Sequence, residues 1–283
     1  MILIADSGST KTLWCLIDND GKEHHFKTEG FNPYFSNQQQ IVNSLQNNML
    51  ADIDADQVLE IYFYGAGCFP DKAYIIKEAM NMVFTKAAVQ VELDLLGAAR
   101  SLLGNTDGFV AILGTGSNSC LFSEGKVVQN IDSLGYLLGD EGSGCYIGKK
   151  LLANYLRGYL PPELAAHFFD TYRLSTPDIM DALYAKPLAN RFCASFSLFV
   201  GENIEHSFMH KLVTDCFDDF FNNLVSNYPN YQNTSFNCVG SVGYRFKDIL
   251  ELSCRKFNMR FGNILQSPME GLTLYHRNVN QMR

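Results

Sequence analysis

The chain has 283 residues, of which 47% are hydrophobic and 18% are charged, and its formal net charge is −8. Ordinary apolar content with 22 glycines and 8 prolines excludes a disordered or collagen-like protein, and the length suffices for two modest domains. The acidic balance argues against nucleic acid or an anionic membrane as the main partner, which favours a small ligand or another protein.

The sequence predicts a cytoplasmic protein. Residues 1–6 carry no basic segment and too short an apolar stretch for a signal peptide, and no later run approaches the about 18 apolar residues of a membrane span. The eight cysteines lie far apart, outside zinc or redox spacings, and this distribution indicates reduced, mostly buried thiols.

Short apolar runs alternate with helical periodicity along the first half, which predicts an α/β fold. We expect two strands joined by a turn, then alternating helices and strands, at residues 2–5, 13–17, 36–50 (helix), 60–64, 70–83 (helix), 89–93 and 95–103 (helix).

The pattern of the first residues repeats near residue 106: residues 109–122 again predict a strand, a Gly/Ser/Thr turn and a second strand. Aligning Gly8 with Gly116 separates the copies by 116 − 8 = 108 residues. We therefore predict duplicated domains at 1–105 and 106–267, the first completed by a C-terminal helix at about 268–283. The second copy is mostly helical from 142 to about 228, with breaks at prolines. Further elements are expected at 235–239, 244–257 (helix) and 263–266.

Two turns between strands are candidate phosphate sites. Residues 6–12 read D-S-G-S-T-K-T and residues 113–117 read L-G-T-G-S, so backbone N–H groups and hydroxyls can approach a phosphate closely. The first is not a Walker A loop, because the chain re-enters a strand instead of a helix. Each turn alone also fits an ordinary hairpin, whereas the pair favours a polyphosphate ligand.

Three further segments carry polar groups or glycines at strand or helix ends. Asp94 follows a strand, where α/β folds bind ligands, although it could instead cap the next helix, and one side chain cannot easily do both. Asp140 and Glu141 lie in G-D-E-G-S-G, where they could bind substrate hydroxyls, or Asp140 or Ser143 could cap a helix. Gly240-Ser241-Val242-Gly243 lets the backbone pass close to a flat ligand or a phosphate.

His206 and His210 form the pattern E-H-x-x-x-H, which is not the metalloprotease order. A solvated helix face is the favoured interpretation of these histidines.

Taken in order, these motifs resemble the actin, Hsp70 and sugar-kinase ATPase superfamily. Residues 6–12 look like its first phosphate motif D-x-G-x-T-x-[ST], 113–117 like the second, and 239–243 like the adenosine motif. Within it, the closest resemblance is to the BadF/BadG/BcrA/BcrD ATPase family and its N-acetylglucosamine kinase members. The further matches are G-F-N-P at 30–33, Asp94 before L-L-G-A, G-D-E-G-S at 139–143 and V-G-S-V at 239–242. Ser7 departs from the motif, since relatives commonly have Gly there, and it adds a side chain to the tightest part of the turn.

The resemblance implies an ATP-dependent kinase acting on N-acetylglucosamine or a related amino sugar. It implies two ribonuclease-H-like domains with ATP and Mg²⁺ in a cleft between them, and a homodimer is typical of similar proteins. By the same resemblance Asp94 is the catalytic base, Asp6 holds Mg²⁺ through water, and Asn32, Asp140 and Glu141 bind the sugar together with Asp94. The implied ATP contacts are Gly8, Ser9, Thr10, Lys11, Thr12, Gly114, Thr115, Gly116, Ser117, Gly240 and Ser241.

Two other functions stay open from the sequence. The same family contains ATPase activators of iron–sulfur acyl-CoA dehydratases or reductases, for which Cys120 and Cys145 are the best cluster ligands, although neither has a close cysteine partner. A nucleotide-gated binding protein without chemistry also fits the motifs.

Overall fold

The computed structural model describes residues 1–281, and the chain divides into two compact units. The first comprises Met1–Asp107, Phe122–Val127 and Ser267–Arg283; the second comprises Gly108–Leu121 and Val128–Gln266. Residues 282 and 283 of the predicted C-terminal helix lie outside the described residues.

The first unit is built on a five-stranded sheet in the order β3-β2-β1-β4-β5. Strands β1, β4 and β5 are parallel, whereas β2 pairs antiparallel with both β1 and β3. The elements are β1 (Ile2–Ser7), β2 (Lys11–Ile17), β3 (Glu23–Glu29), α1 (Gln38–Asn48), η1 (Ala55–Gln57), β4 (Glu60–Gly65), α2 (Ala73–Val83), β5 (Ala88–Leu93), α3 (Asp94–Leu103) and α13 (Met269–Gln281).

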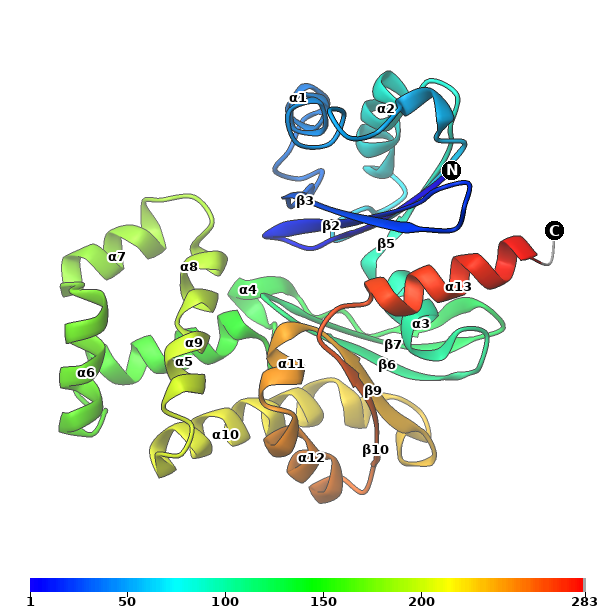
Figure 1. Ribbon diagram of the computed structural model, residues 1–283. Helices are drawn as coiled ribbons and strands as arrows, with labels where there is room; N and C mark the ends of the chain where they lie inside the picture. The colour runs from blue at the N-terminus through cyan, green and yellow to red at the C-terminus, as the bar shows by residue number, and fades with distance from the viewer. Residues whose placement is uncertain (282–283) are drawn as a thin grey trace. The chain divides into compact units, whose positions relative to one another are not determined.

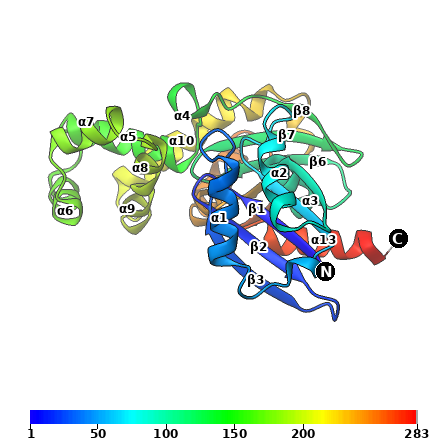
Figure 2. The same ribbon diagram turned by 90° about the horizontal axis from the view of Figure 1, so that it is seen from above.

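Helices cover both faces of this sheet. Successive side chains of β1 point to opposite faces, and both sets are therefore buried. Leu3 and Ala5 belong to the core under α1 and α2, whereas Ile4 packs with Leu272 of α13. Figure 1 shows α1 and α2 on one side of the sheet and α3 and α13 on the other, and Figure 2 looks down through α1 onto β1, β2 and β3.

The second sheet repeats the plan of the first. Its order, β8-β7-β6-β9-β10, is that of the first sheet with each strand replaced by its counterpart, and β6, β9 and β10 are parallel. The strands are β6 (Gly108–Leu113), β7 (Ser117–Ser123), β8 (Lys126–Asn130), β9 (Ser235–Val239) and β10 (Arg260–Leu265). The predicted α/β fold with an internal duplication is confirmed.

Helices make up most of the second unit, as the sequence predicts for residues 142–228. They are α4 (Gly135–Leu138), α5 (Gly144–Leu156), α6 (Pro162–Tyr172), α7 (Thr176–Tyr184), α8 (Ala189–Ser195), α9 (Ser197–Glu202), α10 (Ser207–Asn223), η2 (Val225–Asn227), η3 (Tyr231–Asn233), α11 (Ser241–Arg245) and α12 (Lys247–Lys256). In Figures 1 and 2, α6 and α7 lie at the outer end of α5, away from the sheet of their unit.

The sequence prediction missed the edge strands β3 and β8 and the short helix α4, and it joined α11 and α12 into one helix. Strand β3 reads E-H-H-F-K-T-E and β8 reads K-V-V-Q-N. Both lie at an edge of their sheets, where few apolar residues are needed and the alternating pattern is weak. Helix α1 begins two residues later than predicted, because Asn37 and Gln40 form the capping box.

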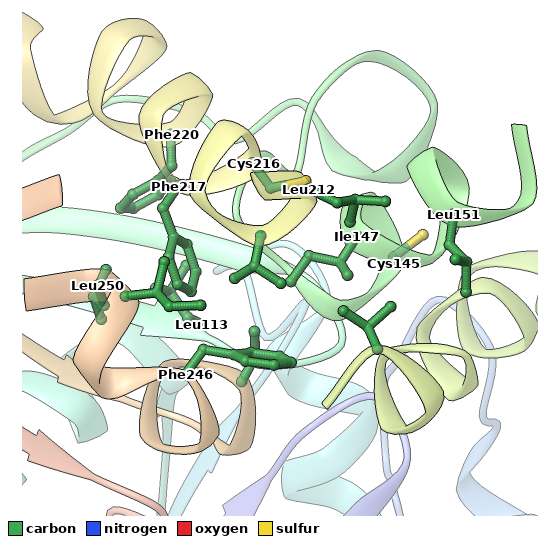
Figure 3. Packing of buried hydrophobic residues seen from close by; sticks show 14 of the residues in the cluster. Leu113, Cys145, Ile147, Leu151, Leu212, Cys216, Phe217, Phe220, Phe246 and Leu250 are labelled. Atoms are coloured by element: carbon green, nitrogen blue, oxygen red, sulfur yellow. The ribbon is translucent and has the colours of Figure 1, made fainter. Parts of the chain in front are cut away.

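The core of the second unit anchors the end of β6. Figure 3 shows Leu113, the last residue of β6, packed among aliphatic and aromatic side chains of α5, α10 and the α11–α12 segment, and Leu113 is fully buried. The labelled neighbours are Cys145, Ile147, Leu151, Leu212, Cys216, Phe217, Phe220, Phe246 and Leu250. The turn that follows Leu113 therefore starts from a residue that the core holds in place.

No helix within residues 1–281 combines the length and apolarity needed to cross a membrane.

A buried polar network links β4, α3 and α13 in the first unit. Arg100 donates a hydrogen bond to the Tyr64 hydroxyl at 2.7 Å, and this hydroxyl lies 2.9 Å from Nε2 of His276. The His276 ring also stacks on Tyr62 at 3.9 Å. Burial, aided by the Arg100 charge, lowers the pKa of His276 to about 3. His276 is therefore neutral at physiological pH, with Nε2 accepting the Tyr64 proton.

This neutral histidine predicts an acid-sensitive fold. Between pH 6.5 and about 3 the unfolded chain binds a proton at His276 that the folded chain does not, so the unfolding free energy falls as the pH decreases through this window. We expect a loss of about 1 kcal/mol between pH 7.5 and 5.5 that is absent in His276→Gln. Urea unfolding of both proteins at the two pH values measures it, and equal losses in both would contradict the assignment.

Candidate active site

The register of the first sheet brings two carboxyl groups to the same edge. Ser7 at the end of β1 pairs with Gly65 of β4, which pairs with Leu93 of β5. Asp6 therefore lies at the carboxyl end of β1, and Asp94 follows directly on the carboxyl end of β5. Both side chains are half-buried, so this edge of the sheet combines negative charge with partial exclusion of water.

Burial raises the pKa values of both acids towards neutrality. The pKa of Asp6 is raised to about 7 by burial and by the nearby charge of Asp94, and Lys11 partly offsets this rise. Burial raises the pKa of Asp94 to about 6, against the hydrogen bond from Leu95. The raised pKa values bring both groups near the range in which a carboxylate serves as a general base.

Asp94 both supports its helix and offers a free lone pair. It is the first residue of α3, and its Oδ1 accepts a hydrogen bond from the Leu95 N–H at 2.9 Å. A carboxylate has two oxygens with about four acceptor positions, so this bond leaves capacity for a substrate hydroxyl. The N-cap of α3 is Leu93, without a side-chain cap bond, and the catalytic role of Asp94 stays a prediction.

The first phosphate turn is open at Gly8. The Gly8 N–H donates to the Lys11 carbonyl at 3.0 Å, and a Cβ built at Gly8 meets nothing nearer than that carbonyl at 3.9 Å. Ser9 is half-buried, and Thr10 and Lys11 are exposed. There is thus room beside the Gly8 backbone for an atom the size of a methyl group.

The Thr12 side chain bonds within the protein, and its predicted role as a phosphate contact stays a prediction. Its side chain is fully buried, and its hydroxyl donates to the Glu29 carbonyl at 2.9 Å and lies 2.8 Å from the Ser7 hydroxyl. Ser7 is likewise fully buried, so the serine side chain does not fill the phosphate turn as the sequence comparison suggested. Both hydroxyls point into the first unit.

Asn32 lies beside the ends of β1 and β4. The segment before it runs against the phosphate turn, since a Cβ at Gly30 would stand 2.2 Å from the Gly8 carbonyl oxygen. The Asn32 side chain packs on Gly67, where a Cβ would come within 2.7 Å of Asn32 Oδ1, and this oxygen accepts from the Tyr34 N–H at 2.9 Å. The half-buried amide is thus held at the edge where Asp6 and Asp94 lie.

In the second unit, the second phosphate turn is tied to the start of α5. The Gly114 N–H donates to the Gly116 carbonyl at 3.0 Å and closes the turn. The N–H groups of Gly144 and Cys145 then donate to the carbonyls of Gly114 and Thr115, at 2.8 and 3.0 Å. These bonds turn the carbonyls inward, towards the protein.

Asp140 supports this turn from behind. It is buried, its Oδ1 accepts from the Ser117 N–H at 3.2 Å, and a Cβ at Gly116 would lie 3.1 Å from its Oδ2. Burial raises its pKa, and the Ser117 bond opposes the rise. Glu141 accepts a hydrogen bond from Asn223 at 2.9 Å. Neither contact supports the predicted sugar-binding role, which stays a prediction; the helix cap of α5 is Ser143.

The segment 239–243, which resembles the adenosine motif, packs against the second phosphate turn. Gly240 has φ = +134°, and a Cβ there would lie 2.3 Å from the Leu113 carbonyl oxygen and 3.2 Å from the Gly114 nitrogen. Ser241, the first residue of α11, is exposed. The strand ends of β6 and β9 thus bring the second phosphate turn and the adenosine motif together within the second unit.

A buried hydroxyl in this cluster has no partner in the protein. Ser117 is buried, and its Oγ forms no hydrogen bond among the residues that the structure describes. An unsatisfied buried hydroxyl is costly, so Ser117 Oγ lowers the stability of the second phosphate turn.

The remaining candidates do not form a second site. His206 Nδ1 caps α10 by accepting from the Phe208 N–H at 3.1 Å, so this nitrogen is not available to a metal. Within residues 1–281, metal-type ligands gather only at Cys15, Glu23 and His25, and Glu23 already pairs with Arg277 at 2.9 Å.

The cysteines do not support an iron–sulfur cluster. All eight are free and buried, including Cys120 and Cys145. A cluster shared between subunits needs thiolates at the surface, and burial raises the pKa of Cys120 to about 12, which keeps it protonated.

Sequence reasoning missed the close approaches at Gly30 and Gly67, which place Asn32. The sequence signals were the glycine of G-F-N-P and the G-A-G run that begins at the last residue of β4. The need for glycine at these positions can be explained only once the neighbouring atoms are known.

No protein-family model and no curated protein matches the chain. Among solved structures, a Porphyromonas gingivalis protein described as a "putative N-acetylglucosamine kinase" is 40% identical, with 99% of this chain and 100% of that chain covered and a TM-score of 0.94. A Chromobacterium violaceum protein with the same description is 17% identical, covers 97% and 98%, and has a TM-score of 0.69.

A ROK family glucokinase from Streptomyces griseus, solved with glucose and AMPPNP, is 15% identical over 99% of both chains, with a TM-score of 0.55. The two distant likenesses show the fold, an actin-like pair of ribonuclease-H-like domains. The full-length likeness at 40% identity, together with the strand-end carboxylates and the two glycine turns, shows that the chain belongs to the N-acetylglucosamine kinase-like family of the actin, Hsp70 and sugar-kinase superfamily.

Proposed function

We propose that this protein is an ATP-dependent kinase that phosphorylates a hydroxyl of N-acetylglucosamine or a related amino sugar. The observation that carries the proposal is the position of Asp94: a half-buried carboxyl at the end of a parallel strand, with a pKa raised by burial to about 6. Such a group is ionised at pH 7 yet basic enough to accept a proton from an attacking hydroxyl.

In this mechanism Asp94 orients the sugar hydroxyl and accepts its proton. As the hydroxyl oxygen forms a bond to the terminal phosphorus of ATP, the bond between that phosphorus and ADP breaks, and the proton stays on Asp94. Positioning contributes much of the rate in such reactions. The amide of Asn32, held on Gly67, is our candidate for binding the sugar beside Asp94.

The second unit would bind the nucleotide. Gly114, Thr115, Gly116 and Ser117 would contact phosphate oxygens, and the open space at Gly114, where a Cβ would meet no atom within 4 Å, supports this. Gly240 and Ser241 would lie against the adenosine, and Gly8, Ser9, Thr10 and Lys11 of the first unit would bind the phosphates to be transferred. Asp140 supports the second phosphate turn through Ser117, and sugar contacts of Asp140 and Glu141 remain part of the proposal.

The residues present also fit a magnesium ion. Two half-buried carboxyls at one edge, with pKa values raised by burial and, for Asp6, by the charge of its neighbour, form an oxygen donor set that a hard cation would stabilise. Asp6 would hold Mg²⁺ through water. The ion would supply charge neutralisation for the phosphate oxygens.

A coupled ADP-release assay with Mg-ATP tests the proposal. We would measure N-acetylglucosamine, N-acetylmuramic acid, glucosamine and plain hexoses, and confirm the product by the added mass of one phosphate group. We expect at least one amino sugar to raise ADP release about a hundredfold or more over the rate without sugar. ATP binding without any sugar-dependent ADP release would instead indicate a non-catalytic nucleotide-binding protein.

Two further expectations belong to this proposal. A cytoplasmic location fits the eight free cysteines, and a homodimer follows from the family resemblance alone. Light scattering after size-exclusion chromatography measures the molar mass and so tests whether the protein is a dimer.

A further inference from the structure

Two buried hydroxyls connect the first phosphate turn to the segment that carries Asn32. Ser7 ends β1 and Thr12 lies opposite it in β2. Both side chains are fully buried, and their oxygens are 2.8 Å apart. The pair therefore closes the base of the turn that runs from Gly8 to Lys11.

Each hydroxyl also bonds to the segment that follows β3. The Phe31 N–H donates to Ser7 Oγ at 2.9 Å, and the Thr12 hydroxyl donates to the Glu29 carbonyl at 2.9 Å. Because Thr12 uses its proton on Glu29, its oxygen is free to accept the Ser7 proton. The chain of bonds from Phe31 through Ser7 and Thr12 to Glu29 is thus satisfied, and each member fixes the next.

The same segment touches the turn along its backbone. The Gly30 N–H donates to the Thr10 carbonyl at 3.2 Å, and Gly30 lies so close to the Gly8 carbonyl that a Cβ would overlap it at 2.2 Å. Phe31 is packed edge-on against Trp14, with ring centres 6.2 Å apart. Asn32 comes next in the chain, so its position follows from these contacts.

We propose that the Ser7–Thr12 hydroxyl pair positions the acceptor sugar relative to the phosphate turn. The inference rests on the proposed function. Ser7 and Thr12 are positioning residues: they act through Phe31 on Asn32 and touch neither ATP nor sugar. Loss of the pair should weaken sugar binding and leave ATP binding intact, because the backbone of the turn itself keeps its bond from Gly8 to Lys11.

The first test does not depend on activity. In Ser7→Ala the buried Phe31 N–H loses its acceptor, so hydrogen–deuterium exchange of a peptide covering residues 30–36 should become about tenfold faster than in the wild type. Ser253→Ala is the control: Ser253 is equally buried, and its hydroxyl bonds Asp218 at 3.0 Å in the second unit. Unchanged exchange at residues 30–36 in Ser7→Ala overturns the proposal.

The second test separates sugar from nucleotide. For Ser7→Ala and Thr12→Val we expect the KM for the sugar to rise about tenfold, with the Kd for an ATP analogue within about twofold of wild type. Thr12→Ser retains the hydroxyl and should restore most of the loss. Ser253→Ala should keep the wild-type KM.

The outcomes are distinct. A sugar KM that stays unchanged, or that rises in step with the Kd for the ATP analogue, overturns the positioning role. If the wild type phosphorylates no sugar, the proposed function fails, whereas the exchange measurement still decides whether the hydroxyl pair holds residues 30–36.

Discussion

Replacing Asp94 with asparagine is expected to lower sugar phosphorylation by about 10²- to 10⁴-fold, the usual contribution of a general base. Asparagine keeps an oxygen that can accept from the Leu95 N–H, so the start of α3 should remain in place. The substitution also removes the charge that raises the pKa of Asp6. Because Asp94 is assigned to the sugar hydroxyl and not to the nucleotide, binding of an ATP analogue should stay within about twofold of wild type. Initial rates at saturating sugar, with calorimetry for the nucleotide, measure both quantities.

Glu92 provides the matched control for this variant. It lies two residues earlier on β5, is half-buried, and pairs in register with Tyr64 rather than standing at the strand end. Glu92→Gln should retain most of the activity. Wild-type turnover in Asp94→Asn, or an equal loss in both variants, would remove Asp94 from the role of base.

The largest effect on stability and nucleotide binding is expected for Gly240→Ala. At φ = +134° an alanine is strained, and its Cβ would stand 2.3 Å from the Leu113 carbonyl oxygen, so β6 and β9 must separate. We expect the unfolding free energy to fall by about 3 kcal/mol or more and ATP binding to be lost. Chemical denaturation and calorimetry measure the two effects.

Gly114→Ala separates packing from ligand contact in the same cluster. A Cβ at Gly114 meets no atom within 4 Å, so the unfolding free energy should change by less than about 1 kcal/mol. If phosphates lie against this turn, the added methyl group occupies their approach, and the affinity for ATP should fall about tenfold. A variant that keeps both its stability and its ATP affinity would show that phosphates do not contact Gly114.

The sequence predicted the parts of the fold that depend on local pattern. Buried strands such as β4 and β6 are nearly continuous apolar runs, and the repeated plan of strand, glycine turn and strand identified the duplication before the matching strand orders were known. Asp94 could be singled out as a candidate because the end of a parallel strand is a general ligand position.

Features that depend on contacts between distant segments could not be predicted. Thr12 fits the phosphate motif, yet its hydroxyl points to Glu29, seventeen residues later. The partner of Asp140 is the backbone of Ser117, and no periodicity in the sequence indicates that bond. Edge strand β3 has a mostly polar pattern, since only its pairing with β2 makes it a strand.

The first unit is discontinuous in the chain, and this has a consequence for its biosynthesis. Helix α13, whose Leu272 and His276 fill the face beneath β1 and β4, leaves the ribosome only after every residue of the second unit. Until then Ile4 and Tyr62 lack part of their cover, so the nascent first unit keeps an exposed apolar face while the second unit is being synthesised. A substitution that disrupts α13 would therefore expose Ile4 and Tyr62, which lie far from it in the sequence.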